Sequence, residues 1–130
     1  MARKKIELEY ILNTRSQSLV WDAISTPAGL EGWFADRIEV SNKTVTFYWG
    51  ENDEESRVAE VAALRTFFYI RFKWLDNPHD REYFELRMTQ NELTNDFILE
   101  IKDFGESDEL DELEELWDSD VEALRRIKGF

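Results

Sequence analysis

The chain has 130 residues, of which 42% are hydrophobic, 14% are aromatic and 35% are charged, and its formal net charge is −13. This length predicts a single domain over residues 1–130, and eighteen aromatic residues supply enough surface to bury a core. The lack of cysteine excludes disulfides, Cys-based zinc sites and thiol catalysis, while the negative charge argues against nucleic acids and anionic membranes as partners.

The first residues carry three bases, Arg3, Lys4 and Lys5, as the start of a signal peptide would. Glu7 and Glu9 then interrupt any apolar stretch, so we expect no secretory signal. No uncharged apolar run approaches the roughly 20 residues that span a bilayer. We therefore expect a cytoplasmic protein without membrane insertion.

Residues 4–12 alternate between apolar and charged side chains, which is typical of a strand with one buried face. A polar break follows, and apolar residues at helical spacing predict a helix over about residues 15–24. Thr26 and Pro27 then suit the N-cap and first position of a second short helix. We expect this helix to run through Leu30 to Trp33 and Phe34.

Six short strands are predicted next, because apolar alternation recurs between turn-forming segments. They cover residues 37–40, 44–49, 57–64, 67–74, 82–89 and 96–102. Serial strands joined by short turns favour an antiparallel meander, and the alternation implies one covered and one solvated face.

The last segment predicts a long amphipathic helix with Ser107 as its cap. About 21 residues would span roughly 31 Å, enough to cover a whole sheet. Acidic residues precede basic ones, as the helix dipole favours. Its apolar stripe consists of Leu110, Leu113, Leu116, Trp117, Val121, Leu124 and Ile127. Residues 103–130 carry a net charge of −8, so most of the acidity lies here.

The segment 19–27 (Leu-Val-Trp-Asp-Ala-Ile-Ser-Thr-Pro), followed by Leu30 and by Trp33-Phe34, resembles a signature of the START-like (SRPBCC) superfamily. It is most similar to the branch named for activators of heat-shock-protein ATPase. The resemblance implies an α+β helix-grip fold of the order β-α-α-β(5–6)-α, in which a curved antiparallel sheet wraps around the long C-terminal helix. It also implies a cavity between sheet and helix that takes a small apolar or amphipathic ligand.

The candidate lining residues are mostly aromatic side chains that the alternation places on the covered face. They are Trp33, Phe34, Phe47, Trp49, Phe72, Trp74, Phe84, Phe97, Trp117, Val121 and Leu124. A filled core and a hollow cavity use the same residue types, so both alternatives stay open. Trp33 and Phe34 are either a core plug or a gate at the mouth of the cavity.

Few other residues suggest a catalytic or metal-binding role. His79, the only histidine, lies in a turn and is expected to be solvated, so we predict no metal site, no cofactor and no catalytic residue. Arg71 and Glu85 are expected to pair across two strands on the solvated face. Glu60 and Tyr10 are the candidate groups for an enzyme of the polyketide cyclase kind.

These observations favour non-catalytic binding of a small hydrophobic or amphipathic ligand between the sheet and the C-terminal helix. The alternative is a protein-interaction module or chaperone cofactor that uses the acidic C-terminal helix. A polyketide cyclase-like enzyme is the third hypothesis. Both a monomer and a homodimer agree with the sequence.

Overall fold

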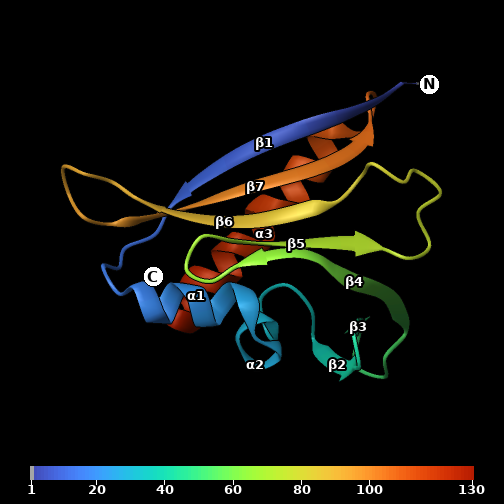
Figure 1. Cartoon of the computed structure of the whole chain (residues 1–130), viewed down its shortest axis with the longest axis horizontal. Coiled ribbons are helices and arrows are strands. Elements are labelled where there is room, and N and C mark those ends of the chain that lie inside the picture. Colours follow the sequence, from blue (N-terminus) through green and yellow to red (C-terminus); the bar gives the residue numbers. More distant parts are fainter. Residues whose placement is uncertain (1) are drawn as a thin grey trace.

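The structure, a computed structural model, describes residues 2–130 and contains seven strands and three helices in that part of the chain (Figure 1). In chain order these are β1 (Arg3–Ile11), α1 (Gln17–Ser25), α2 (Pro27–Leu30), β2 (Arg37–Ser41), β3 (Thr44–Trp49), β4 (Glu55–Arg65), β5 (Tyr69–Trp74), β6 (Phe84–Gln90), β7 (Phe97–Glu106) and α3 (Leu110–Lys128).

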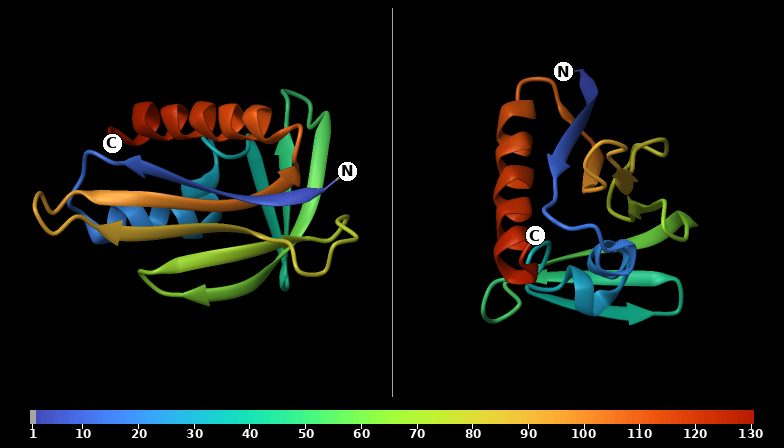
Figure 2. Two further views of the ribbon diagram at one scale, coloured as in Figure 1. Left: turned by 90° about the horizontal axis from the view of Figure 1, so that it is seen from above. Right: turned by 90° about the vertical axis from the view of Figure 1, so that its left-hand side faces the viewer.

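All seven strands form one antiparallel sheet in the order β1-β7-β6-β5-β4-β3-β2. Strands β2 to β7 form the predicted meander, and β1 joins its end by pairing with β7. The sheet curves, and α3 runs along it beside β1 and β7 (Figure 2). The predicted α+β helix-grip fold is therefore confirmed.

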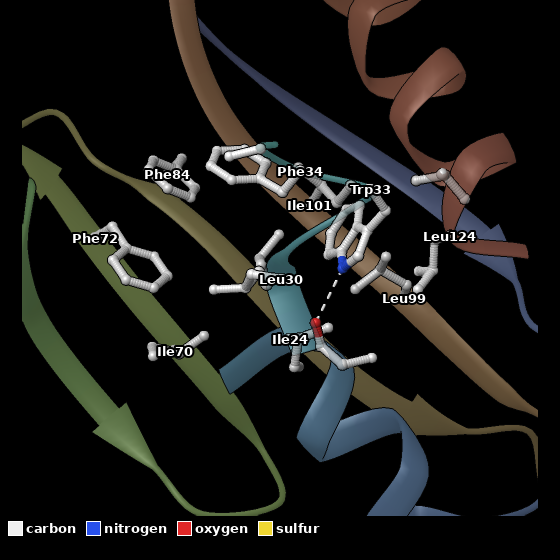
Figure 3. Packing of buried hydrophobic residues seen from close by; sticks show 14 of the residues in the cluster. Ile24, Leu30, Trp33, Phe34, Ile70, Phe72, Phe84, Leu99, Ile101 and Leu124 are labelled. Atoms are coloured by element: carbon white, nitrogen blue, oxygen red, sulfur yellow. Dashed lines mark hydrogen bonds between the residues drawn. The ribbon is translucent and has the colours of Figure 1, made fainter. Parts of the chain in front are cut away.

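Helices and sheet share one hydrophobic core. Buried residues of α1 and α2, such as Ile24 and Leu30, lie between Ile70 of β5 and Leu99 of β7, with Leu124 of α3 nearby (Figure 3). Burying this apolar surface is the main force that holds the three helices against the inner face of the sheet.

Helix α2 begins as predicted but is shorter, and α1 begins at Gln17, two residues later than predicted. The hydroxyls of Ser16 and Thr26 accept hydrogen bonds from the backbone N–H groups of Leu19 and Gly29, so both act as N-caps. Helix α2 ends at Leu30, because Gly32 has a φ of +94°, which no right-handed helix accommodates. The prediction that it reaches Trp33 and Phe34 is wrong, and both residues lie in the following turn.

Helix α3 begins later than expected. Ser107 is not its cap: Glu109 is the N-cap, without a side-chain capping bond. The charge order agrees with the prediction, with Asp111 and Glu112 in the first turn and bases in the last, before a left-handed Gly129. Of the predicted stripe, Leu116 and Ile127 are 64% and 49% exposed and do not belong to the core.

Two strands extend further than predicted, and two begin later. Strand β4 begins two residues early and β7 runs on to Glu106. Strand β5 begins only at Tyr69, because Phe67 adopts a φ of +68° in the preceding turn, and Phe68 beside it is exposed. Strand β6 begins at Phe84 rather than at residue 82. The extensions of β4 and β7 bring charged side chains onto the inner face of the sheet.

The outer face differs from the expectation at Glu85, which is fully buried rather than solvated. The predicted pairing with Arg71 is present, with N–O distances of 2.8 and 3.1 Å, and Arg87 and Lys102 add further ion pairs. Burial raises the pKa of Glu85, but hydrogen bonds from Arg71 and Arg87 outweigh it and hold the pKa below its usual range.

Candidate functional site

A cavity of about 410 Å³ lies between the start of α3 and one end of the sheet. We call it the α3 cavity. Its walls come from the loop after α2, from strands β3 to β7 and from α3. It is lined by Phe34, Trp49, Glu55, Arg57, Trp74, Phe84, Asp103, Leu113, Leu116, Trp117 and Asp120.

Aromatic rings form the apolar wall of the α3 cavity. Phe34 stacks on Trp117 and on Phe84, with ring centroids 5.5 and 5.2 Å apart. The indole N–H of Trp49 donates to the carbonyl oxygen of Phe34 at 2.9 Å, which fixes the loop after α2 against β3. Trp74 and Phe84 follow, 5.1 Å apart. These ring contacts and the Trp49 hydrogen bond hold the aromatic side chains in fixed positions, so the wall has a defined shape.

Asp103 is the first of two half-buried carboxyl groups in the lining. It continues the inward-facing series Phe97, Leu99 and Ile101 of β7. Its Oδ2 accepts the indole N–H of Trp117 at 2.9 Å, and its Oδ1 accepts the backbone N–H of the next residue at 2.8 Å. Burial raises the pKa of Asp103 to about 6, although both hydrogen bonds act in the opposite direction.

Asp120 is the second half-buried carboxyl group. It lies one turn after Trp117 and two turns after Leu113, on the cavity side of α3. Burial alone raises the pKa of Asp120 to about 7. No hydrogen bond to its side chain is present in residues 2–130, so this carboxyl group is free to contact a molecule in the cavity.

Strand β4 contributes Glu55 and Arg57, the remaining charged groups of the lining. The Nε and Nη2 of Arg57 bind the two carboxylate oxygens of Asp76 at 3.0 and 2.7 Å. The guanidinium carbon lies 4.0 Å from the centre of the Trp74 ring. Asp76 therefore already compensates the one positive charge of the cavity wall.

Five of the eleven predicted lining residues lie in the cavity wall: Phe34, Trp49, Trp74, Phe84 and Trp117. The other six lie in the core beside it and do not reach the cavity: Trp33, Phe47, Phe72, Phe97, Val121 and Leu124. The indole N–H of Trp33 donates to the carbonyl oxygen of Ala23 at 3.0 Å, as a core plug requires (Figure 3). Phe34 combines both alternatives, since it is buried and also faces the cavity.

Sequence reasoning missed every charged residue of the lining. Two signals could have found them: the inward alternation of β4 and β7 continues through Arg57 and Asp103, and Asp120 interrupts the apolar stripe of α3. The predicted strands ended too early at Lys102 and began too late at Arg57, so neither Asp103 nor Glu55 was placed on a strand.

The other candidates lie outside the cavity. His79 is exposed in its turn, and among residues 2–130 no three acidic or histidine side chains are grouped as a metal ion would need. Glu60 is exposed, and the Tyr10 hydroxyl donates to Asp118 at 2.5 Å on the surface. Neither proposed group for a cyclase-like enzyme therefore faces the α3 cavity.

A second pocket of about 320 Å³ lies beside α2 and β2 to β5. Its lining is apolar apart from Ser25 and includes the half-exposed Val40 and Leu64. It holds no charged group, unlike the α3 cavity. Over residues 2–130, no helix has the length and apolar character needed to span a bilayer.

Comparison with solved structures supports the fold. A solution structure of the protein BfR322 from Bacteroides fragilis is 55% identical, with a TM-score of 0.68, and the match covers 100% of this chain and 94% of that one. The Aha1 dimer from Colwellia psychrerythraea is 15% identical, with a TM-score of 0.75 and coverage of 93% and 92%. DynU16, a protein of the dynemicin biosynthetic locus, is 15% identical, with a TM-score of 0.74, and the match covers 94% of this chain but 46% of that one.

No curated protein matches the sequence. The family model of the START-like superfamily domain matches residues 1–130. The Aha1 neighbour shares the fold of this chain. The chain belongs to the START-like superfamily.

Proposed function

We propose that this protein binds a small amphipathic ligand in the α3 cavity without transforming it. The observation that carries the proposal is the cavity itself, a space of about 410 Å³ walled by five aromatic rings and four charged side chains. Small-molecule sites have volumes of roughly 300–1,000 Å³ and combine an apolar wall with a few polar groups. A ligand of the size of a substituted phenyl ring with a short chain suits this space.

Membership of the START-like superfamily supports the proposal, because domains of this class generally bind ligands. The polar groups are placed to orient a bound molecule. Asp103 is held by two hydrogen bonds, whereas Asp120 has a free carboxyl group. An apolar body would lie against Trp49, Trp74 and Trp117, with its polar end toward the two acids.

Nuclear magnetic resonance of the indole N–H groups tests this proposal with a neutral probe, 4-phenylbutan-1-ol. The resonances of Trp49 and Trp117 should shift in a saturable manner, since both side chains line the cavity. The resonance of Trp33 should not shift, because its N–H binds Ala23 in the core.

A pair of variants locates the binding. Leu116→Trp adds bulk at the exposed edge of the cavity, where Leu116 is 64% exposed, and should abolish the shifts. Leu93→Trp adds the same bulk in a turn where Leu93 is 94% exposed, and should leave them unchanged. Equal binding by both variants would show that the probe does not enter the α3 cavity, and the proposal would be wrong.

The protein-partner alternative stays a prediction. The acidic residues that it would use, among them Asp111, Glu112 and Glu115, are exposed on α3. Exposed acidic residues are also what the solvated face of an ordinary amphipathic helix carries. A cyclase-like reaction also stays a prediction. It would have to use Asp103 or Asp120, because Glu60 and Tyr10 do not face the cavity.

A further inference from the structure

We infer that the ligand of the α3 cavity carries one organic cation, a protonated amine or a quaternary ammonium group, on an apolar or aromatic body. This inference rests on the function proposed above and adds the chemical class of the ligand. It follows from the balance of charges in the wall and from the tryptophan rings that line it.

The charge balance of the cavity wall is negative. Three carboxyl groups line it, those of Glu55 on β4, Asp103 on β7 and Asp120 on α3. Arg57 is the single base, and it is paired through two nitrogens with Asp76. No other ionisable side chain faces the cavity from any element that forms it. The charge of Arg57 also acts on Asp103 and lowers its pKa, whereas no charged group of residues 2–130 acts on Asp120 in this way. An incoming cation would therefore meet Asp120 as an acid that the chain leaves without a matching base.

The aromatic wall is suited to the same ligand. Cations bind over the faces of aromatic rings at up to about 6 Å, and Trp is the best partner. The wall already holds one cation in this way, since the Arg57 guanidinium lies 4.0 Å from the centre of the Trp74 ring. Trp49 and Trp117 contribute two further indole rings to the lining, and the indole N–H of Trp117 donates to Asp103.

The two other ligand charges fit less well. An anion would lie beside the acids Asp103 and Asp120. Arg57, the only base of the lining, could bind it only by giving up its ion pair with Asp76. A neutral ligand would bury both acids further without compensating their charge. A cation favours their ionised form, so it opposes the effect by which burial raises the pKa of Asp103 and of Asp120. Binding of the cation should consequently strengthen as the pH rises through about 6 to 7.

A matched series of probes tests the inference at pH 8: 4-phenylbutylamine, 4-phenylbutan-1-ol and 4-phenylbutanoate. They share one apolar body and differ in charge. We expect the amine to bind about tenfold more tightly than the alcohol, as one ion pair and one cation–π contact predict. The carboxylate should bind most weakly. Affinity is read from the indole N–H resonances of Trp49 and Trp117, with that of Trp33 as the internal control.

Asp120→Asn should bring the affinity for the amine to within about threefold of that for the alcohol, and leave the affinity for the alcohol unchanged. Glu122→Gln removes the same charge from an exposed position of α3 and should change neither affinity. An unaltered indole spectrum of each free variant shows that the fold is retained.

Three results would overturn the inference. Equal affinities for amine and alcohol would show that charge is not recognised, while the proposed binding function would stand. Tightest binding of the carboxylate would identify Arg57 as the anchor and an anion as the ligand. Failure of all three probes to shift the Trp49 and Trp117 resonances would remove the proposed function as well.

Discussion

Replacing Asp120 by Asn should stabilise the protein at high pH and have no effect at low pH. In the fold, burial raises the pKa of Asp120 to about 7 from the ordinary value of 3.8. The fold therefore accommodates the protonated form of Asp120 better than the ionised form. Below pH 3.8 the side chain is protonated in both the folded and the unfolded chain, and the free energy of unfolding has its full value. As the pH rises from 3.8 to about 7, the unfolded chain ionises Asp120 more readily than the folded chain does, and the free energy of unfolding falls.

The magnitude follows from the difference between the two pKa values. At about 1.4 kcal/mol for each pKa unit, a difference of about three gives an upper limit of about 4 kcal/mol. Solvent reaches the half-buried carboxyl group and screens it, so we expect about 1–2 kcal/mol. For a domain of this size, that gain raises the melting temperature by about 3–8 °C.

Thermal and urea unfolding at pH 3.5 and pH 8 measure the effect in the Asp120→Asn variant and in Glu122→Gln. Glu122 is exposed on the same helix, so the second variant controls for the loss of one negative charge from an acidic protein. A stabilisation of Asp120→Asn that is the same at both pH values, or equal to that of Glu122→Gln, would refute the argument from burial.

Three further predictions concern packing and hydrogen bonding. Gly29→Ala should destabilise the protein by about 3 kcal/mol in urea unfolding, since the added Cβ would lie 1.8 Å from the backbone oxygen of Asp22. Glu85→Gln should cost about 2 kcal/mol at pH 7 and less at pH 3, because the lowered pKa of Glu85 makes its ion pairs stabilising above about pH 4.5 and ineffective once it is protonated. Trp117→Phe should raise the pKa of Asp103 by about one further unit, measured from its carboxyl carbon resonance, because the carboxylate loses a hydrogen bond.

Each of these predictions has a control in the chain. Gly129→Ala meets no atom within 4 Å and should cost only about 1 kcal/mol for its positive φ, so equal losses at both glycines would contradict the steric argument. Glu60→Gln removes an exposed acid and should be nearly neutral, unlike Glu85→Gln. Trp49→Phe removes an indole that does not bind Asp103, and an equal change in the pKa of Asp103 would contradict the role of the Trp117 hydrogen bond.

Local patterns in the sequence predicted most of the fold. The alternation of β1, β3 and β6 indicated both the strands and their buried faces, because side chains of a strand point to opposite faces in turn. Thr26 caps α2 as predicted, since capping depends only on residues three positions apart. These features depend on neighbours in the chain, and no tertiary contact is needed to infer them.

The element boundaries that failed depend on single residues and on distant partners. Gly32 ends α2 by its positive φ, which a helical pattern of apolar residues does not reveal. Strand β7 continues to Glu106 because β1 pairs with it as far as Arg3. Glu85 is buried although its strand alternates regularly, because Arg71 and Lys102 from neighbouring strands converge on it.

In the candidate site, too, some features follow from the sequence and others from the tertiary structure. From the sequence alone, the chain could be read as a START-like domain with an aromatic inner face, and five of the aromatic residues expected there do line the α3 cavity. Only the tertiary structure decided that Trp33 and Phe47 fill the core, and that Asp103 of β7 and Asp120 of α3 line the same cavity. The physical reason is that alternation and helical spacing determine which face of an element a side chain occupies, whereas the space left between two packed faces depends on how closely the elements approach each other.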